Sequence, residues 1–161
     1  ARPLSPPVAA CGRPVTIGRF EVTEQILNTD MRSAGNVQSL ITPVMINSGL
    51  YAGMPEGTLG LPDSNPNVNP NITIESVVIG VLGSNQFNFV NSYIVAPRID
   101  SALVFYPDTA NLGQPHGIAT NTIGFVDTRI LGGGRQRATN PGASLDPIGD
   151  YQVRVGFLPP A

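Results

Sequence analysis

The sequence predicts an all-β protein, and three features of its composition support that prediction. Of its 161 residues, 28 are Ile or Val, whose branched side chains pack well on pleated sheets. The 18 glycines and 16 prolines divide the apolar segments into short runs. Lysine is absent and charged residues make up only 12% of the chain, which excludes a coiled coil or a long helical bundle. We therefore expect a single β-sandwich, jelly-roll-like, with an extended N-terminal arm.

The arm comprises residues 1–14, and the β-sandwich domain comprises residues 15–161. Four prolines in the first 14 residues fix φ and remove backbone donors, so this segment is predicted to be extended rather than a strand or a helix. A proline-stiffened arm has little conformational entropy left to lose. It is therefore suited to lying across a neighbouring subunit.

Alternation of apolar and polar residues predicts about seven strands after the arm. A change of phase at Gly18 and Arg19 indicates a β-bulge, Pro43 favours an edge position for the second strand, and the apolar third strand is expected to be central. Residues 83–85 (Gly-Ser-Asn) have the turn chemistry of a hairpin. The predicted strands are residues 15–22, 41–47, 71–82, 86–96, 101–106, 122–131 and 151–158.

Two further segments, residues 22–27 and 33–40, are weak candidates for short helices. Their periodicity is too low to compete with the sheet-favouring composition. No repeat with a period of 20–50 residues is apparent in the sequence. The chain is therefore expected to form one sandwich rather than a repeat architecture.

The sequence contains few residues suited to catalysis. Cys11 and His116 are the only cysteine and the only histidine, so neither a cysteine-based zinc site nor a histidine cluster can form. No G-x-S-x-G nucleophile motif is present, and His116 between Pro115 and Gly117 is expected in a surface turn. We therefore expect no catalytic, cofactor-binding or metal residues, and no enzyme activity.

Two loops have a functional alternative. Residues 63–69 place Asp and Asn at alternate positions, as a calcium loop does, but Pro66 and the lack of a Glu at position 12 favour a polar turn. Residues 132–137 (Gly-Gly-Gly-Arg-Gln-Arg) could cradle an anion, although a mobile loop is favoured. If this second loop has a function, we expect it at an interface with an acidic partner.

Charge and hydropathy exclude two classes of partner. The formal net charge of −2 lacks the basic excess of an electrostatic nucleic-acid binder. No apolar run approaches the roughly 18 residues needed to cross a bilayer. The lack of a cysteine pair favours synthesis in a reducing compartment.

In overall character the chain resembles the capsid decoration (cement) proteins of tailed bacteriophages, which are small, mostly β and often trimeric. The resemblance rests on the arm, the lysine-free β domain and the loops rich in Gly, Asn and Pro. It implies a non-enzymatic structural protein of a virion that stabilises the shell by protein–protein contacts. The implied partners are further copies of the chain, foremost as a trimer, and a major capsid or other structural protein. The expected interface residues are Arg2, Leu4, Val8, Arg13, Arg135 and Arg137.

A secreted, extracellular β-sandwich that binds carbohydrate or builds an adhesive fibre is the alternative. Tyr51, Tyr93 or Tyr106 would then provide the aromatic platform. An isomerase or hydrolase on a jelly roll is a third hypothesis. Its glycosidase version, with paired carboxylates from distant strands, is weakened by the absence of tryptophan, on which sugar-cleaving grooves usually stack their substrate.

Overall fold

The computed structural model describes residues 17–62 and 68–156, and all regular structure in these residues is β. The predicted all-β class is confirmed, and neither helix candidate forms a helix. The strands are β1 (Ile17–Glu21), β2 (Ile26–Leu27), β3 (Asp30–Ser33), β4 (Val37–Thr42), β5 (Met45–Ile46), β6 (Gly49–Ala52), β7 (Thr73–Ile79), β8 (Phe89–Val90), β9 (Tyr93–Phe105), β10 (His116–Arg129), β11 (Arg135–Thr139) and β12 (Tyr151–Val155).

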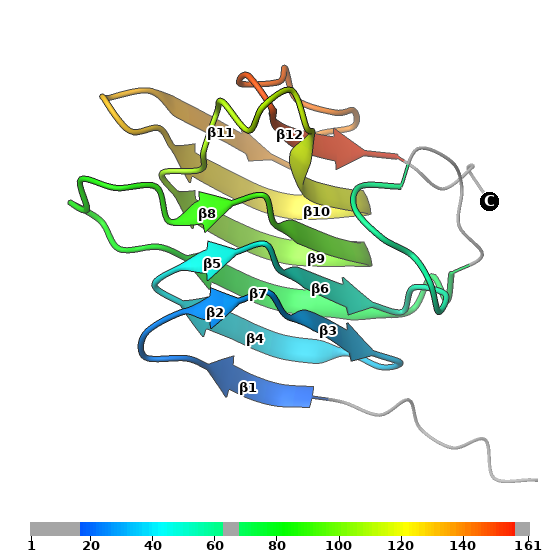
Figure 1. Ribbon diagram of the computed structural model, residues 1–161. Coiled ribbons are helices and arrows are strands. Elements are labelled where there is room, and N and C mark those ends of the chain that lie inside the picture. The colour runs from blue at the N-terminus through cyan, green and yellow to red at the C-terminus, as the bar shows by residue number, and fades with distance from the viewer. Residues whose placement is uncertain (1–16, 63–67, 157–161) are drawn as a thin grey trace, which may run out of the picture.

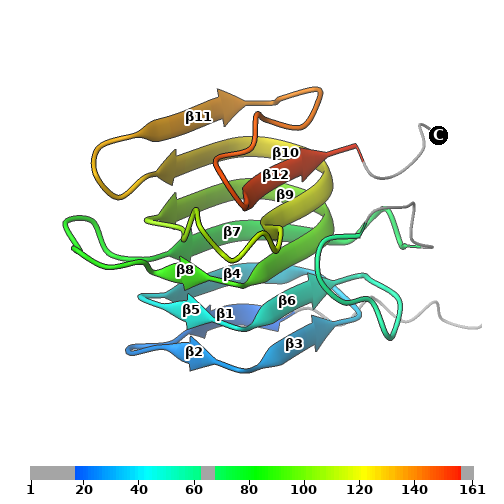
Figure 2. The ribbon, with the colours of Figure 1, turned by 45° about the horizontal axis from the view of Figure 1, so that its top comes forward.

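Successive strands wind into a coil with three faces, and equivalent strands of successive turns lie side by side (Figures 1 and 2). The first face contains β1, β4, β7 and the second halves of β9 and β10, all paired in parallel. The second face contains β2, β5 and β8. The third face contains β3, β6, the first halves of β9 and β10, and β12. This arrangement is a parallel β-solenoid.

The pairing register shows how regular the coil is. Ile17 pairs with Val37, Val37 with Ile74, Ile74 with Ile99, and Ile99 with Ile123. One turn takes about 19 to 25 residues, except where residues 53–71 are inserted between β6 and β7 and where β11 with its flanking loops lies between β10 and β12. The chain is therefore a repeat architecture in three dimensions, contrary to the expectation from the sequence.

The predicted jelly-roll sandwich is not confirmed. A jelly roll consists of antiparallel strands joined by Greek-key connections, whereas nearly all pairs here are parallel and join successive turns of the coil. Residues 83–85 do not form a hairpin, because β7 and β9 pair in parallel and β8 lies between them in the chain. Pairing between β10 and β11 is the exception, since it is antiparallel.

The ends of the predicted strands shift because the chain turns corners that the alternation did not reveal. Pro43 lies at the corner between β4 and β5. The predicted edge position is wrong, because β4 pairs with β1 on one side and with β7 on the other. The predicted strand over residues 86–96 contains the corner between β8 and β9 at Asn91 and Ser92. The prediction that β7 is central is confirmed, because β7 lies between β4 and β9.

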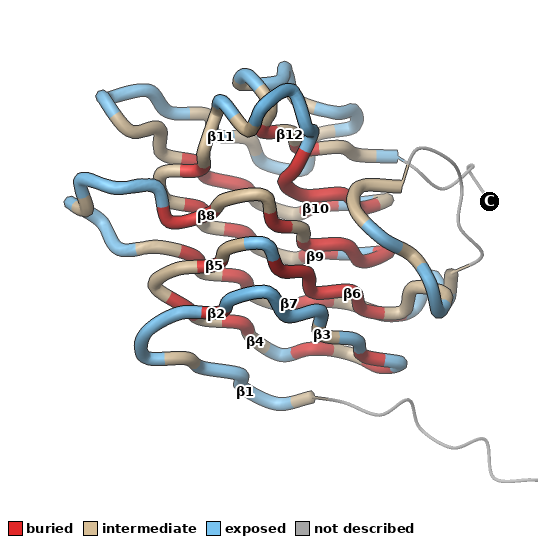
Figure 3. Tube along the Cα trace, viewed as in Figure 1, coloured by how far each residue is buried: buried red, intermediate tan, exposed pale blue. Residues whose placement is uncertain are grey.

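Aliphatic side chains form most of the core inside the coil. Buried residues recur on successive strands of the coil (Figure 3). On the first face, buried residues stand three positions apart, as Val37 and Leu40 do, and the pattern recurs at Ile74 and Val77. Two consecutive residues between them point outward or are only half buried. The phase change at Gly18 and Arg19 is the first instance of this break in alternation. The predicted β-bulge is wrong, because β1 pairs with β4 in an unbroken register from Ile17 to Glu21.

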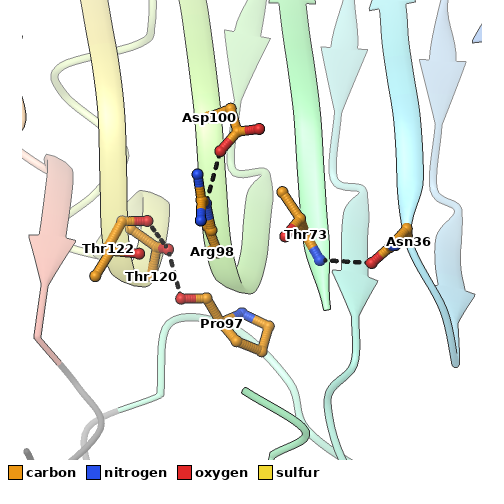
Figure 4. A network of polar contacts seen from close by, with 7 residues as sticks. All are labelled: Asn36, Thr73, Pro97, Arg98, Asp100, Thr120 and Thr122. Carbon is orange, nitrogen blue, oxygen red and sulfur yellow. Dashed lines mark hydrogen bonds and ion pairs between the residues drawn. The ribbon is translucent and has the colours of Figure 1, made fainter. Parts of the chain in front are cut away.

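Polar contacts stabilise the corner between the third and first faces (Figure 4). The Asn36 side chain accepts a 2.9 Å hydrogen bond from the backbone N–H of Thr73, which joins two turns. The buried Thr120 hydroxyl bonds to the Pro97 carbonyl at 3.3 Å, again across two turns. Since no strand pairing satisfies backbone groups at a bend, side chains take over that role.

Candidate functional site

A ladder of asparagines stands at the corner between the second and third faces. Asn28, Asn47 and Asn91 directly follow β2, β5 and β8, and their φ angles are 48°, 47° and 41°. Asparagine tolerates this left-handed conformation better than other residues with a Cβ. The Asn47 amide donates to Asn28 at 3.2 Å, Asn91 donates to Asn47 at 3.0 Å, and Asn111 donates to Asn91 at 3.2 Å.

A second polar ladder lies one residue further along, inside the coil. The Ser48 hydroxyl accepts the Thr29 N–H at 3.1 Å, and the Ser92 hydroxyl accepts the Ser48 N–H at 3.2 Å. Each hydroxyl also donates to the carbonyl two residues before it, Ile46 or Val90, at 2.7 Å. The two ladders hold successive turns of the coil together at this corner.

A groove of about 390 Å³ opens on the outer surface beside the asparagine ladder. The register of the third face places Asp30, Gly49 and Tyr93 in one row across three strands. A Cβ on Gly49 would lie 2.8 Å from an Asp30 carboxylate oxygen and 2.3 Å from the Tyr51 ring. Because Gly49 has no Cβ, the side chains of Asp30 and Tyr51 can occupy this space. The groove is lined by Asp30, Asn47, Ser48, Tyr51, Leu59, Gly60, Asn91 and Tyr93.

One wall of the groove comes from the insertion that follows β6, drawn in teal beside the third face in Figure 1. The Tyr51 hydroxyl accepts the Gly60 N–H at 2.9 Å. The Arg32 guanidinium lies 4.7 Å from the centre of the Tyr51 ring and donates to the carbonyls of Pro55 and Thr58. These contacts attach the insertion to the sheet, and they leave Leu59 70% exposed at the edge of the groove.

Both tyrosines of the groove are neutral hydroxyls at ordinary pH. Burial raises the pKa of Tyr93, and the Asp30 carboxylate raises it further. Burial also raises the pKa of Tyr51, and Asp30 adds to that effect, although the hydrogen bond from Gly60 opposes it. The Tyr93 hydroxyl donates to the Asn91 side chain at 3.1 Å, so the ladder orients it.

The groove therefore combines an exposed carboxylate, side-chain amides, a tyrosine hydroxyl and an exposed leucine. No described residue hydrogen-bonds to the Asp30 carboxylate, so its oxygens are available to accept bonds from a ligand. Asp30 is also the one carboxylate among the described residues that line the groove. Carboxylate, amide and hydroxyl groups of this kind can hydrogen-bond a ligand that carries several hydroxyl groups.

The three tyrosines proposed as an aromatic platform do not lie together. Tyr51 and Tyr93 are in the groove, but Tyr51 is only 2% exposed and cannot stack on a ligand. Tyr106 lines a different cavity, beside Arg129. Only Tyr93, which is partly exposed, is placed to present its ring edge and hydroxyl to a ligand.

His116 is not in a surface turn as expected. It begins β10, is fully buried, and lies 5.7 Å from the Phe89 ring and 5.9 Å from the Tyr151 ring. Burial lowers its pKa, an effect that the carboxylates of Asp108 and Asp150 oppose. The side chain belongs to an interior aromatic cluster, which is a structural role.

The predicted interface residues divide into two groups. Arg135 and Arg137 lie on β11, where Arg135 forms an ion pair with Asp127 and Arg137 lies 5.1 Å from the centre of the Phe125 ring. Arg2, Leu4, Val8 and Arg13 lie outside the described residues, as does most of the loop that was compared with a calcium site.

Within residues 17–62 and 68–156, no group of three or more His, Cys, Asp or Glu side chains is placed to hold a metal ion. That part of the chain also contains no helix that is long and apolar enough to span a membrane.

Comparison with known proteins identifies no relative: no protein-family model, curated protein or solved structure matches the chain. The fold and the groove therefore define the class of the protein, which is a parallel β-solenoid with a polar surface groove.

The asparagine ladder and Asp30 are the residues of the candidate site that sequence reasoning missed. The signal was present as three similar segments, Ile-Leu-Asn-Thr-Asp-Met from Ile26, Met-Ile-Asn-Ser-Gly-Leu from Met45, and Phe-Val-Asn-Ser-Tyr-Ile from Phe89. Each has two apolar residues, an asparagine, a hydroxyl residue, a variable residue and an apolar residue. Two of the variable residues, Asp30 and Tyr93, line the groove.

Proposed function

We propose that the chain is a non-catalytic β-solenoid module that binds neutral carbohydrate in the groove between Asp30 and Tyr93. The observation that carries the proposal is the row of Asp30, Gly49 and Tyr93 across three strands. Sugar hydroxyl groups can donate to the free carboxylate of Asp30. The edge of Tyr93 and the exposed Leu59 side chain offer apolar surface to the C–H groups of a sugar ring.

Rigidity of the groove supports this proposal. Asn91 orients the Tyr93 hydroxyl, and the Gly60 N–H holds the hydroxyl of Tyr51. A binding site whose side chains are already ordered loses little conformational entropy when a ligand binds. Ladder contacts thus contribute to affinity by holding these side chains in place.

The test is binding of neutral oligosaccharides, measured on a glycan array and then by calorimetry, with the intact chain and with Asp30→Asn. Loss of the carboxylate should reduce the affinity for the sugar at least tenfold, which corresponds to about 1.4 kcal/mol. Glu75→Gln is the matched control, because Glu75 is an exposed carboxylate on the first face and should leave affinity unchanged. Absence of saturable binding to every neutral glycan, or equal affinity of Asp30→Asn, overturns the proposal.

We also propose that the module is a structural protein of a virion and that it works as a homo-oligomer. The observation that favours assembly is the apolar end of the first turn, where Phe20 is 40% exposed beside an apolar cavity of about 220 Å³. Other lining residues include Ile17, Met31 and Leu40. Exposed apolar surface of this kind is typical of association sites.

Light scattering of the purified chain tests the assembly. A trimer or larger species that dissociates in Phe20→Ser supports association through this end, and Leu112→Ser is the control because Leu112 is 95% exposed elsewhere. A chain that is monomeric at every concentration and never co-purifies with a particle overturns the virion setting. That result leaves the carbohydrate proposal untouched.

A further inference from the structure

A second cavity lies away from the groove, between the loop that follows β7 and the turn that joins β10 to β11. Its volume is about 470 Å³. The two segments extend from the same end of the first face in Figure 1. The cavity is lined by Leu82, Ser84, Asn85, Tyr106, Arg129, Ile130, Leu131, Gly132, Gly133, Gly134 and Arg135.

Two arginines contribute to this cavity, and they differ in their partners. Arg135 donates from Nε to a carboxylate oxygen of Asp127 at 2.8 Å, so Asp127 neutralises its charge. Nε of Arg129 is buried and has no hydrogen-bond partner among the described residues. A buried donor without a partner is costly, particularly on a charged group. Arg129 forms no ion pair with a described residue, so its charge leaves the cavity with a net positive charge that an anionic ligand can balance.

Tyr106 holds the two segments together in a strained conformation. Its φ is 55°, which is uncommon for a bulky residue, and such strain is typical of functional sites. The Tyr106 N–H donates to the carbonyl of Arg129 at 2.6 Å, and its hydroxyl accepts the Gly83 N–H at 3.1 Å. The residue thus fixes the distance between the loop and the strand that bears Arg129.

The glycines of the turn leave the mouth of the cavity open. Gly132 and Gly133 have φ angles of 91° and 113°, and a Cβ on either would meet no atom within 4 Å. Leu82, which is 61% exposed, provides an apolar edge opposite them. An anionic group can therefore approach Arg129 without displacing a side chain from this turn.

We propose that this cavity binds an oxyanionic group, a carboxylate, sulfate or phosphate, through the guanidinium of Arg129. A guanidinium offers a planar fork of N–H donors that matches two oxygens of such a group. Arg137, which the sequence grouped with this loop as a second anion ligand, is not part of the cavity. This site is separate from the carbohydrate groove, so each can fail while the other stands.

Nuclear magnetic resonance titration of the intact chain tests the site with three probes: sodium sulfate, inorganic phosphate and glucuronate. The amide signals of Gly132 and Gly133 should shift in a saturable manner with at least one probe, and the strongest probe identifies the oxyanion class. Binding should weaken as sodium chloride increases, since screening reduces the attraction. An adventitious ion only, with the same weak shifts for all three probes and for chloride, overturns the proposal.

Substitution of Arg129 locates the charge that binds the probe. Arg129→Met should reduce affinity at least tenfold, and Arg129→Lys should retain part of it because the charge stays and the fork is lost. Arg98→Met is the control, since Arg98 forms an exposed ion pair with Asp100 on the first face. If Arg129→Met fails to fold, the affinity of Arg129→Lys and the shifts of the wild-type amide signals still test whether Arg129 binds the probe. Unchanged affinity in the folded variants overturns the assignment.

Discussion

The amide of Asn91 donates a 3.0 Å hydrogen bond to the side-chain oxygen of Asn47, although the two residues are 44 positions apart in the sequence. Asn47 in turn donates to Asn28. Each asparagine adopts a left-handed backbone at the same corner, so the side chains stack in register with the strands. Successive turns of the coil therefore share both the backbone conformation of this corner and its side-chain hydrogen bonds.

Asn47 is the central member of this ladder, and Asn47→Ala should lower the free energy of unfolding by about 3 kcal/mol. Alanine is disfavoured by roughly 1–2 kcal/mol at a left-handed φ, and two side-chain hydrogen bonds of roughly 1 kcal/mol each are lost. Asn47→Gly should be less destabilising, because glycine adopts this conformation freely. Urea unfolding monitored by circular dichroism measures both variants.

Asn71→Ala is the control for the ladder. Asn71 is exposed, has no positive φ, and should change stability by less than about 0.5 kcal/mol. Equal losses in Asn47→Ala and Asn71→Ala contradict the role of the ladder.

The sequence predicted what depends on composition and on local alternation. Ile and Val content gave the all-β class, and the apolar run around Val77 and Val78 gave a central strand. The phase change at Gly18 was also correctly located. These features depend on residues that are close in the chain.

Parallel stacking was missed because it depends on pairing between distant segments. The insertion at residues 53–71 changes the spacing between Val37 and Ile74, so no fixed period is present in the sequence. Short strands such as β5 and β8, with two residues each, are too short to show alternation. The groove was missed for the same reason, since Asp30 and Tyr93 become neighbours only through the register.

His116 makes stability depend on pH. In the unfolded chain its pKa is about 6.5, and burial lowers the pKa in the folded state. The unfolded state therefore binds more protons below pH 6.5, and stability should fall as the pH decreases from about 6.5 toward the folded pKa. The slope contributed by one such group approaches about 1.4 kcal/mol per pH unit. Urea unfolding between pH 5 and pH 8 measures it.

His116→Phe removes this titration and keeps an aromatic ring between Phe89 and Tyr151. The variant should lose less stability than the wild type between pH 6.5 and pH 5. Identical pH slopes in the two proteins would contradict the contribution of His116 to the pH dependence of stability.

Arg32 attaches the insertion to the wall of the groove, and Arg32→Met should loosen it locally. The guanidinium donates to the carbonyls of Pro55 and Thr58. Loss of a partly exposed contact of about 1 kcal/mol corresponds to roughly fivefold more frequent opening. Hydrogen exchange of the Gly60 amide, which bonds to Tyr51, should accelerate by that factor. Arg19→Met is the control, and equal exchange of Gly60 in both variants contradicts the prediction.

Gly117 is a position where the coil has no room for a side chain. Its φ is 133°, and a Cβ would lie 2.1 Å from the carbonyl oxygen of Gln152 on β12. Gly117→Ala should therefore push β12 away from β10 and destabilise the fold by about 3 kcal/mol, through backbone strain and loss of packing around Tyr151. Gly142→Ala is the control, because a Cβ there meets no atom within 4 Å and should cost less than about 0.5 kcal/mol. Urea midpoints and the near-ultraviolet tyrosine signal measure the two effects. If both variants unfold at the same midpoint, the close contact between β10 and β12 does not limit stability.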